Sequence, residues 1–300
     1  MQTVVPISRR GTLAPFESWS NQRHFVGARI SSRWVALLVA LALWSDGIAL
    51  AASAGTTLRV FAAASLADAF GEIGARFERT HPGVKVQLNL AGSQVLATQL
   101  EQGAAADVFA AADRRWMEQA HDHSLLAGES RLFARNRLVV VVPRTNPARI
   151  GRLQDLARRG IKLVIGAETV PVGAYSRELL QKLGRQPGFP SDYARRVLGN
   201  VVSEEENVKS VLGKVQLGEA DAGIVYRSDI TPALARSVRR LDMPDSVNVQ
   251  ASDWIAVVRG AAHPDLARDF VALVVAAEGQ RILARFGLIP AASATPGSPG

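Results

Sequence analysis

The 300-residue chain contains no cysteine and only three tyrosines, and aromatic residues make up 6% of it. The lack of cysteine excludes disulfides, thiolate metal sites and cysteine nucleophiles. The sequence also lacks the phosphate-binding motif G-x-x-x-x-G-K-[ST], the nucleophile motif G-x-S-x-G and the zinc motif H-E-x-x-H. We therefore predict that the protein is not an enzyme and carries no cofactor.

A hydrophobic run long enough for a membrane span is also missing. The apolar run at residues 34–44 is shorter than the ~20 residues needed to cross a bilayer. Arg29 and Arg33 precede it, and a small-residue segment follows with A-x-A sites that end at Ala51 and Ala54. A basic region, a short apolar core and an A-x-A site are the three parts of a secretory signal. The sequence therefore predicts a periplasmic protein, exported through a signal peptide that is cleaved after one of these alanines.

The charge balance is basic, with a formal net charge of +8 at pH 7. Residues 1–54, the predicted signal peptide and its upstream extension, hold five arginines against Glu17 and Asp46, a net of +3, which leaves +5 for the mature chain. Its arginines are scattered and form no basic stripe with interleaved aromatic residues, so we do not expect nucleic acid as a partner. A hydrophobic content of 48% with 21% charged residues indicates a soluble globular protein.

From residue 58 onward, predicted strands alternate with predicted helices. Buried strands are expected at residues 58–64, 84–90, 107–112, 138–142, 163–167, 222–226 and 247–258. Amphipathic periodicity predicts helices at residues 65–77, 95–102, 175–183 and 208–217, and one or two helices within residues 265–286. This alternation implies an α/β fold with parallel sheets covered by helices on both faces. Its length suggests two sheets joined by crossing segments.

Several of the predicted helices begin at a small or hydroxylated residue that directly follows a strand or loop. These junctions lie at residues 64–65, 92–93, 172–173 and 207–208. A helix N-terminus presents unpaired N–H groups and a partial positive charge, so several of them aimed at one cleft would form an anion trap. Each junction by itself is also compatible with ordinary helix capping.

These junctions also carry a resemblance to a known family. The segments at residues 60–66, 91–93, 106–117, 170–173, 223–229 and 286–288 occur in the order found in the periplasmic molybdate-binding proteins of ABC importers. With these segments the chain resembles that family over residues 58–290. The resemblance implies a two-lobed periplasmic binding protein of type II, with mixed, mostly parallel sheets joined by crossing hinge strands.

The resemblance further implies how the chain divides. The expected parts are lobe 1 (first part) at residues 55–136, lobe 2 at residues 137–254, a return to lobe 1 as C-terminal helices at residues 255–290, and a disordered tail at residues 291–300. Residues 138–142 and 255–258 would form the crossing strands.

Carried over residue by residue, the resemblance places the ligand contacts on Ser65 and Ser93 from lobe 1 and on Val172, Val208 and Tyr226 from lobe 2. The three hydroxyls would donate directly, and backbone N–H groups would donate at both serines and both valines. The ion would be held through its oxygen atoms, so its molybdenum or tungsten would have no direct ligand from the protein. About six to eight donors, each contributing roughly 1.5–3 kcal/mol to a charged acceptor, can hold such an ion without arginine or lysine.

This donor set offers no acceptor, so hydrogen phosphate would leave its proton unpaired, whereas molybdate, tungstate and sulfate carry no proton. We expect the substrate-binding component of a molybdate or tungstate importer, a monomer that delivers the oxyanion to a membrane permease. A binding protein for another oxyanion such as sulfate, and an enzyme on the same two-lobe fold, are the alternatives. A ferric-iron site would favour paired tyrosines, and Tyr175, Tyr193 and Tyr226 are not adjacent in the sequence. A transcription regulator would need a DNA-binding element where residues 1–54 carry the signal.

The sequence departs from the family just before Val208, where Asn207 stands in place of the aspartate expected of close relatives. The helix there could begin early, with Ser203 and Glu206 as a capping box, and would then use the Val208 N–H internally. We favour Asn207 as the N-cap. The acidic residues 204–206 are interpreted as the first turn of a helix, favoured by its dipole, rather than as acid–base carboxylates.

Overall fold

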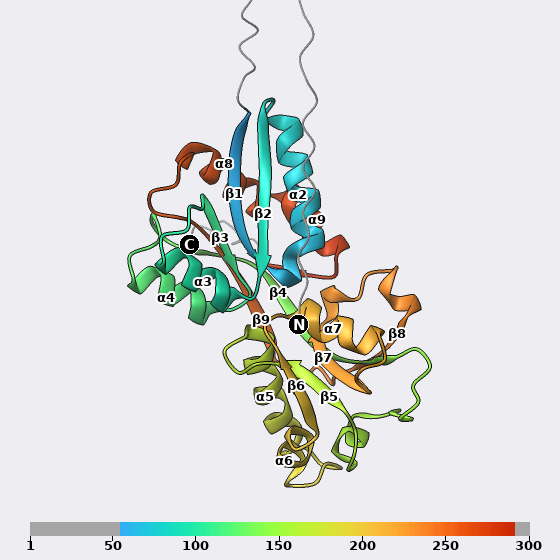
Figure 1. Ribbon diagram of the computed structural model, residues 1–300. Coiled ribbons are helices and arrows are strands. Elements are labelled where there is room, and N and C mark those ends of the chain that lie inside the picture. The colour runs from blue at the N-terminus through green and yellow to red at the C-terminus, as the bar shows by residue number, and fades with distance from the viewer. Residues whose placement is uncertain (1–54, 292–300) are drawn as a thin grey trace, which may run out of the picture. The chain divides into compact units, whose positions relative to one another are not determined.

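The computed structural model describes residues 55–291 of the chain (Figure 1). The predicted signal peptide lies outside the described residues, and so does the tail from residue 292 onward. None of the helices within residues 55–291 is long and apolar enough to cross a membrane.

The described strands form a ten-stranded mixed sheet with the order β2-β1-β3-β9-β4-β7-β5-β6, to which β8 and β10 add by pairing with β4. The strands are β1 (Thr56–Ala63), β2 (Val84–Ala91), β3 (Val108–Ala111), β4 (Arg131–Pro143), β5 (Leu163–Gly166), β6 (Val201–Glu205), β7 (Ala222–Tyr226), β8 (Val238–Asp242), β9 (Gln250–Val257) and β10 (Ile289–Pro290). Strand β1 pairs parallel with β2 and β3, and β5 pairs parallel with β6 and β7. The antiparallel pairs gather around β4 and β9.

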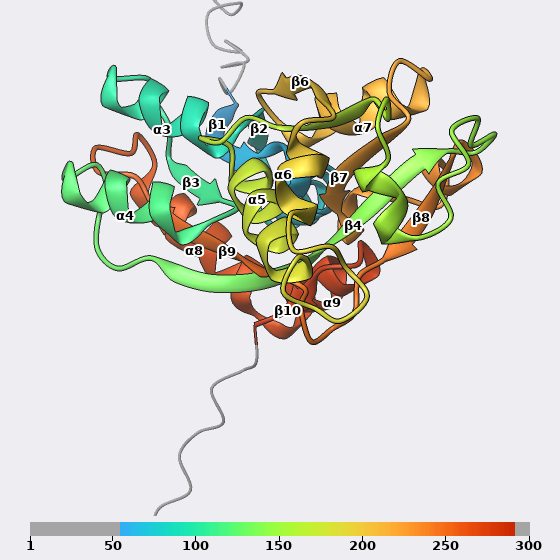
Figure 2. The same ribbon diagram turned by 90° about the horizontal axis from the view of Figure 1, so that it is seen from below.

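The 13-residue strand β4 carries the chain from one half of the sheet to the other. Its first part, up to Arg137, pairs with β9 and β10, and its second part, from Leu138, pairs with β7 and β8. Strand β9 runs antiparallel beside the first part and brings the chain back to β3. Figure 2 shows β4 as the long strand that continues through both halves. The fold is therefore two α/β lobes joined by crossing strands, which confirms the predicted fold class.

Helices cover the sheet in both lobes. The α-helices are α2 (Ala67–Thr80), α3 (Ser93–Glu101), α4 (Arg114–Asp122), α5 (Pro171–Leu183), α6 (Tyr193–Leu198), α7 (Val208–Gln216), α8 (Pro264–Val275) and α9 (Ala277–Arg285). Short 3-10 helices are η1 (Ala64–Leu66), η2 (Leu153–Ala157), η3 (Arg227–Asp229) and η4 (Leu234–Arg236). The segment at residues 265–286, for which the sequence predicts one or two helices, forms two, α8 and α9.

Lobe 1 contains β1, β2, β3, β10, the first part of β4 and the end of β9. Helices α2, α8 and α9 share one core of this lobe, and α3 and α4 share a second core (Figure 1). Helix α2 packs on the sheet through one apolar face. Phe70, Ile73 and Phe77 recur at helical spacing on this face and are all fully buried. Phe70 lies 5.7 Å from Phe133 of β4 and 5.9 Å from Phe270 of α8, measured between ring centroids. Each such burial stabilises the fold by about 1.5–3 kcal/mol.

Lobe 2 contains β5 to β8 and the second part of β4, with α5, α6 and α7 packed on them around one core. Residues 138–143 of β4 and all four residues of β5 are buried. Continuous burial explains why these strands read as unbroken apolar runs in the sequence. Tyr193 of α6 is also buried, and its hydroxyl donates to the carbonyl oxygen of Leu153 at 2.5 Å.

The sequence does not predict strands β6 and β8. Strand β6 lies at the end of the sheet order and carries Val202, which is 60% exposed, so it presents no apolar run. In β8, Arg239 and Arg240 interrupt the apolar pattern. The interpretation of residues 204–206 as a helical turn was wrong, because Glu204 and Glu205 belong to β6 and the next helix begins at Val208.

Candidate functional site

A small pocket lies between the two lobes, where strands end and the following helices begin. It is lined by Ala63, Ala64, Ser65, Ala91, Gly92, Ser93, Ala112, Val170, Pro171, Val172, Asn207, Val208 and Tyr226. Open α/β sheets bind ligands at this carboxyl end of their strands. All five residues predicted as ligand contacts are among these lining residues. None of the lining residues carries a formal charge.

Ser65 lies in η1, directly after β1, and its side chain is buried. The sequence allows it to be a helix cap, but neither η1 nor α2 has a side-chain capping bond. Its Oγ has no hydrogen-bond partner among the described residues. A buried hydroxyl without a partner costs roughly 1–3 kcal/mol, so its position on a pocket wall favours a ligand over a purely structural role.

Ser93 is the first residue of α3 and is fully buried. The Ala112 N–H donates to Ser93 Oγ at 3.0 Å. Because this N–H occupies an acceptor site of the hydroxyl, the hydroxyl proton stays available for donation. The preceding Gly92 is required by a close approach of the two lobes: a Cβ at this position would lie 2.3 Å from the carbonyl oxygen of Glu206.

Helix α5 of lobe 2 begins at the pocket with Pro171 and Val172. Its N-cap residue Val170 has no side chain that could occupy the first N–H groups, and no side-chain capping bond forms. Gly173 permits the helix to start this close to β5, because a Cβ there would lie 2.0 Å from the Ala167 carbonyl oxygen. First-turn N–H groups have no partner inside a helix, which leaves the Val172 N–H as a donor.

Helix α7, the second helix of lobe 2 at the pocket, begins at Val208. The Asn207 side chain accepts the Ser210 N–H at 3.0 Å, which confirms Asn207 as the N-cap. Ser203 lies in β6 and does not start the helix. The Val208 N–H is therefore in the first turn, without an intrahelical partner and at the positive end of the helix dipole.

Tyr226 is the last residue of β7 and is 2% exposed. Its hydroxyl has no hydrogen-bond partner among the described residues. Burial raises the pKa of this hydroxyl well above its ordinary value of 10.0, and the neighbouring Tyr175 and Asp253 raise it further. The hydroxyl therefore keeps its proton at neutral pH and can donate it to an anion.

Three buried carboxyl groups surround this tyrosine, and sequence reasoning does not identify them. Burial raises the pKa of Asp113 to about 6 and that of Asp229 to about 7. Burial also raises the pKa of Asp253 well above 3.8, and its Oδ2 has no hydrogen-bond partner among the described residues. In each case the raised pKa favours the neutral form of the carboxyl group, which lowers the negative charge close to the pocket. Asp113 and Asp229 lie in segments that carry the family resemblance, but nothing local in the sequence shows that they are buried.

The two lobes are in contact around the pocket. Gln94 of α3 donates through Nε2 to the Glu206 carbonyl oxygen at 2.7 Å, and Trp116 of α4 donates through Nε1 to the Thr169 carbonyl oxygen at 2.9 Å. Each of these bonds joins a lobe 1 helix to a lobe 2 loop. Hydrogen bonds thus join the two lobes around the pocket, and sequence reasoning does not find these bonds because their partners are far apart in the chain.

The sequence model of the family described as bacterial extracellular solute-binding protein matches residues 58–289. The chain belongs to this family. The match covers both lobes, including every residue that lines the pocket. Family membership places this solute-binding protein among extracellular or periplasmic proteins, in agreement with the export predicted from the sequence.

Two relatives of this solute-binding protein carry the same name. The molybdate-binding protein ModA of Mycobacterium tuberculosis (strain H37Rv) is 43% identical over 228 residues, which cover 76% of this chain and 82% of that protein. The molybdate-binding protein ModA of Escherichia coli (strain K12) is 33% identical over 240 residues, which cover 77% of this chain and 88% of that protein. These relatives confirm the family resemblance recognised in the sequence.

Solved structures show the same fold. The periplasmic molybdate-binding protein of Azotobacter vinelandii matches with a TM-score of 0.67 at 19% identity, covering 78% of this chain and 99% of that one. The sulfate-binding protein SubI of Mycobacterium tuberculosis matches with a TM-score of 0.70 at 18% identity, covering 80% of this chain and 88% of that one. At these identities the likeness establishes the two-lobed solute-binding fold and not the ligand.

Proposed function

We propose that this solute-binding protein is the periplasmic substrate-binding component of an ABC importer and captures molybdate or tungstate in the interlobe pocket. The observation that carries the proposal is that three buried hydroxyls on the uncharged wall of the pocket are available to donate hydrogen bonds. Those of Ser65 and Tyr226 have no partner among the described residues, and that of Ser93 accepts a backbone N–H and retains its own proton. The names of the relatives from Mycobacterium tuberculosis and Escherichia coli support the same ligand.

The chemistry of the pocket suits a small dianion. Burying an unpaired ion costs tens of kcal/mol in the Born limit, so the ion must find donors on all sides. Three hydroxyls and the N–H groups at the starts of α3, α5 and α7 supply them, each contributing roughly 1.5–3 kcal/mol to a charged acceptor. The helix N-termini add about 0.3–1 kcal/mol each through their dipoles. Capture then requires no arginine or lysine in the wall.

The same wall disfavours an oxyanion that carries a proton. The lining residues include no carboxylate, and the Ser93 oxygen already accepts the Ala112 N–H. Hydrogen phosphate would have to use the Ser65 or Tyr226 hydroxyl as an acceptor for its O–H, and that hydroxyl would then no longer donate to the anion, at a cost of roughly 1.5–3 kcal/mol. Molybdate, tungstate and sulfate avoid this cost, and they differ among themselves mainly in radius.

Five further features belong to the proposal. The chain is exported through a cleaved signal peptide within residues 1–54, acts as a monomer and hands its ligand to a membrane permease. It catalyses no reaction. Lobe 1 comprises residues 55–136 and 255–290, and lobe 2 comprises residues 137–254, with β4 and β9 as the hinge strands.

Native mass spectrometry of residues 55–300 tests the proposed ligand. The protein is freed of bound anions and exposed to equal concentrations of molybdate, tungstate, sulfate and phosphate in one solution. The expected result is a single adduct per chain with the mass of molybdate or tungstate. A dominant sulfate or phosphate adduct, or no adduct at all, would contradict the proposed ligand.

A further inference from the structure

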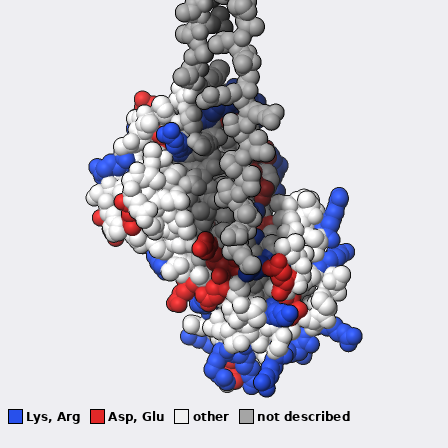
Figure 3. All heavy atoms as spheres, in the orientation of Figure 1, with Lys and Arg blue, Asp and Glu red and all other residues white. Residues whose placement is uncertain are grey.

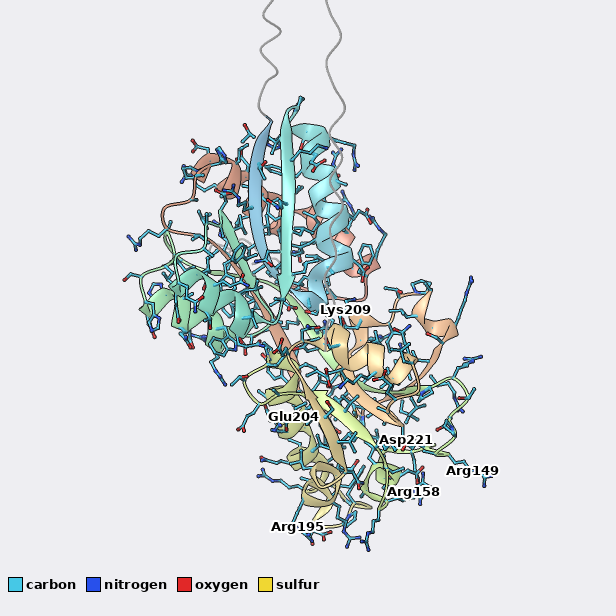
Figure 4. The ribbon with its side chains drawn as sticks, in the orientation of Figure 1. Arg149, Arg158, Arg195, Glu204, Lys209 and Asp221 are labelled. Atoms are coloured by element: carbon cyan, nitrogen blue, oxygen red, sulfur yellow. The ribbon has the colours of Figure 1, made fainter. Side chains whose placement is uncertain are left out.

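Lys209, the second residue of α7, joins the two lobes through its charge. Its Nζ lies 3.0 Å from Asp68 Oδ2 in the first turn of α2 and 3.7 Å from Asp229 Oδ1 in η3. Figure 4 shows Lys209 where α7 of lobe 2 approaches α2 of lobe 1. Among the ion pairs within residues 55–291, the Lys209–Asp68 pair alone connects a helix of lobe 2 to a helix of lobe 1.

Each of the three charged groups is close in the chain to a predicted ligand contact. Lys209 directly follows Val208, and Asp68 lies one helical turn after Ser65. Asp229 accepts the Tyr226 N–H through Oδ2 at 3.0 Å. A movement that separates Lys209 from Asp68 therefore also separates the donors of lobe 2 from the Ser65 donor of lobe 1.

The charge of Lys209 also matters to a nearby anion. Asp229 is fully buried and its Oδ1 has no hydrogen-bond partner among the described residues, while Asp68 lies beside the same ammonium group. In Figure 3, acidic side chains gather near the middle of the visible face, whereas basic side chains crowd the far end of lobe 2. Without Lys209, two carboxyl groups beside the pocket would lose their paired cation and would repel a bound dianion.

We propose that Lys209 is a positioning residue that couples oxyanion capture to lobe closure. Its ion pair with Asp68 forms when the lobes meet, and its ammonium group offsets the carboxyl charge beside the bound dianion. The inference rests on the proposed function and adds to it a residue that does not line the pocket. An ordinary surface ion pair contributes little, about 0–1 kcal/mol, and would affect neither closure nor affinity measurably.

The test measures closure and affinity on the same molecules. Because the chain has no cysteine, Gln102→Cys and Gln181→Cys place two unique labels on exposed positions of lobe 1 and lobe 2. Single-molecule energy transfer between the labels gives the closed fraction, without anion and along titrations with molybdate, tungstate and sulfate. In this labelled background, Lys209→Met, Lys209→Arg, Asp68→Asn and the double variant Lys209→Met/Asp68→Asn are compared with the parent.

The matched control is Lys214→Met. Lys214 also lies on α7 and pairs with Glu205 at 2.6 Å, but both residues belong to lobe 2. We expect this control to keep the closed fraction and the Kd of the parent. We expect Lys209→Met to raise the Kd roughly tenfold and lower the closed fraction, and Lys209→Arg to restore most of both.

The double variant separates a cross-lobe pair from two independent effects. Because Asp68 acts through Lys209, we expect Asp68→Asn to weaken binding in the parent and to cause no further loss after Lys209→Met. Additive losses in the Kd, or a closed fraction unchanged by Lys209→Met, would overturn the inference. If the parent binds none of the three anions, the proposed function fails by itself. The inference is then decided by the ligand-free closed fraction, which Lys209→Met must lower and Lys214→Met must leave unchanged.

Discussion

Replacing Tyr226 by phenylalanine removes one hydroxyl and keeps the ring that fills the end of β7. If the hydroxyl donates to a charged ligand, its loss should weaken molybdate binding by roughly 1.5–3 kcal/mol. This corresponds to a Kd raised about 10- to 150-fold. The raised pKa of Tyr226 means that the hydroxyl donates throughout the neutral pH range, so the loss should not depend on its titration.

The effect of Tyr226→Phe on stability should have the opposite sign to its effect on binding. The hydroxyl is buried without a partner among the described residues, so its removal relieves an unfavourable desolvation. We expect the free energy of unfolding of the ligand-free protein to stay unchanged or to rise. A purely structural tyrosine would show the reverse, with lower stability and normal affinity.

Tyr193→Phe is the matched control for this experiment. Tyr193 is also a buried tyrosine of lobe 2, but its hydroxyl donates to the Leu153 carbonyl oxygen at 2.5 Å. Removing it deletes a buried hydrogen bond and should lower the free energy of unfolding by about 0.5–1.5 kcal/mol, with the Kd unchanged. Calorimetric titration beside scanning calorimetry measures both quantities for both variants. A Tyr226→Phe protein with the parent Kd would refute the role of this hydroxyl.

Three other outcomes follow from the site. Ser65→Ala should weaken binding by roughly 1.5–3 kcal/mol with little change in melting temperature. Ser93→Ala should lower both the affinity and the melting temperature, because the Ala112 N–H loses its acceptor. Equal melting temperatures of the two variants in scanning calorimetry would argue against this difference. Val208→Ala should change the Kd by less than about threefold, since the predicted donor is a backbone N–H, and a titration showing a hundredfold loss would be incompatible with that contact. The pKa values of Asp113 and Asp229, raised to about 6 and about 7, mean that the folded protein holds protons that the unfolded chain has already lost above pH 3.8. The contribution of these two groups to the free energy of unfolding should therefore fall as pH rises from about 4 to about 7. Denaturant titrations across this range measure the free energy of unfolding, and a rise would contradict the expectation.

The sequence predicted those parts of the fold whose signals are local. Strand β5 and the second part of β4 are buried on both faces, so their apolar runs stand out from neighbouring residues. The five predicted contacts all line one pocket because each lies at a strand-to-helix junction, and the fold brings such junctions to one edge of a parallel sheet.

Other features depend on contacts between distant segments and leave no local trace. The hydrogen bond from the Ala112 N–H to the Ser93 hydroxyl joins residues 19 positions apart in the chain. The hydrogen bond from Gln94 to the Glu206 carbonyl oxygen joins residues 112 positions apart. Asp253 carries a charged group that is usually found at the surface, yet it is 1% exposed and lies on the same face of β9 as Ala251 and Ile255. Ser65 matched the pattern of a helix cap, and only the 3-10 geometry of η1 shows that its hydroxyl caps nothing.

A crystal structure of residues 55–300 grown with molybdate, with diffraction measured on both sides of the molybdenum absorption edge, tests the central claim most directly. Anomalous scattering identifies the metal without reference to the surrounding protein. The account predicts one strong molybdenum peak per chain between the lobes, with its oxygens within about 2.5–3.2 Å of the Ser65, Ser93 and Tyr226 hydroxyls and of the Val172 and Val208 N–H groups. A peak elsewhere on the protein, or an interlobe pocket without molybdenum at saturating molybdate, would contradict it.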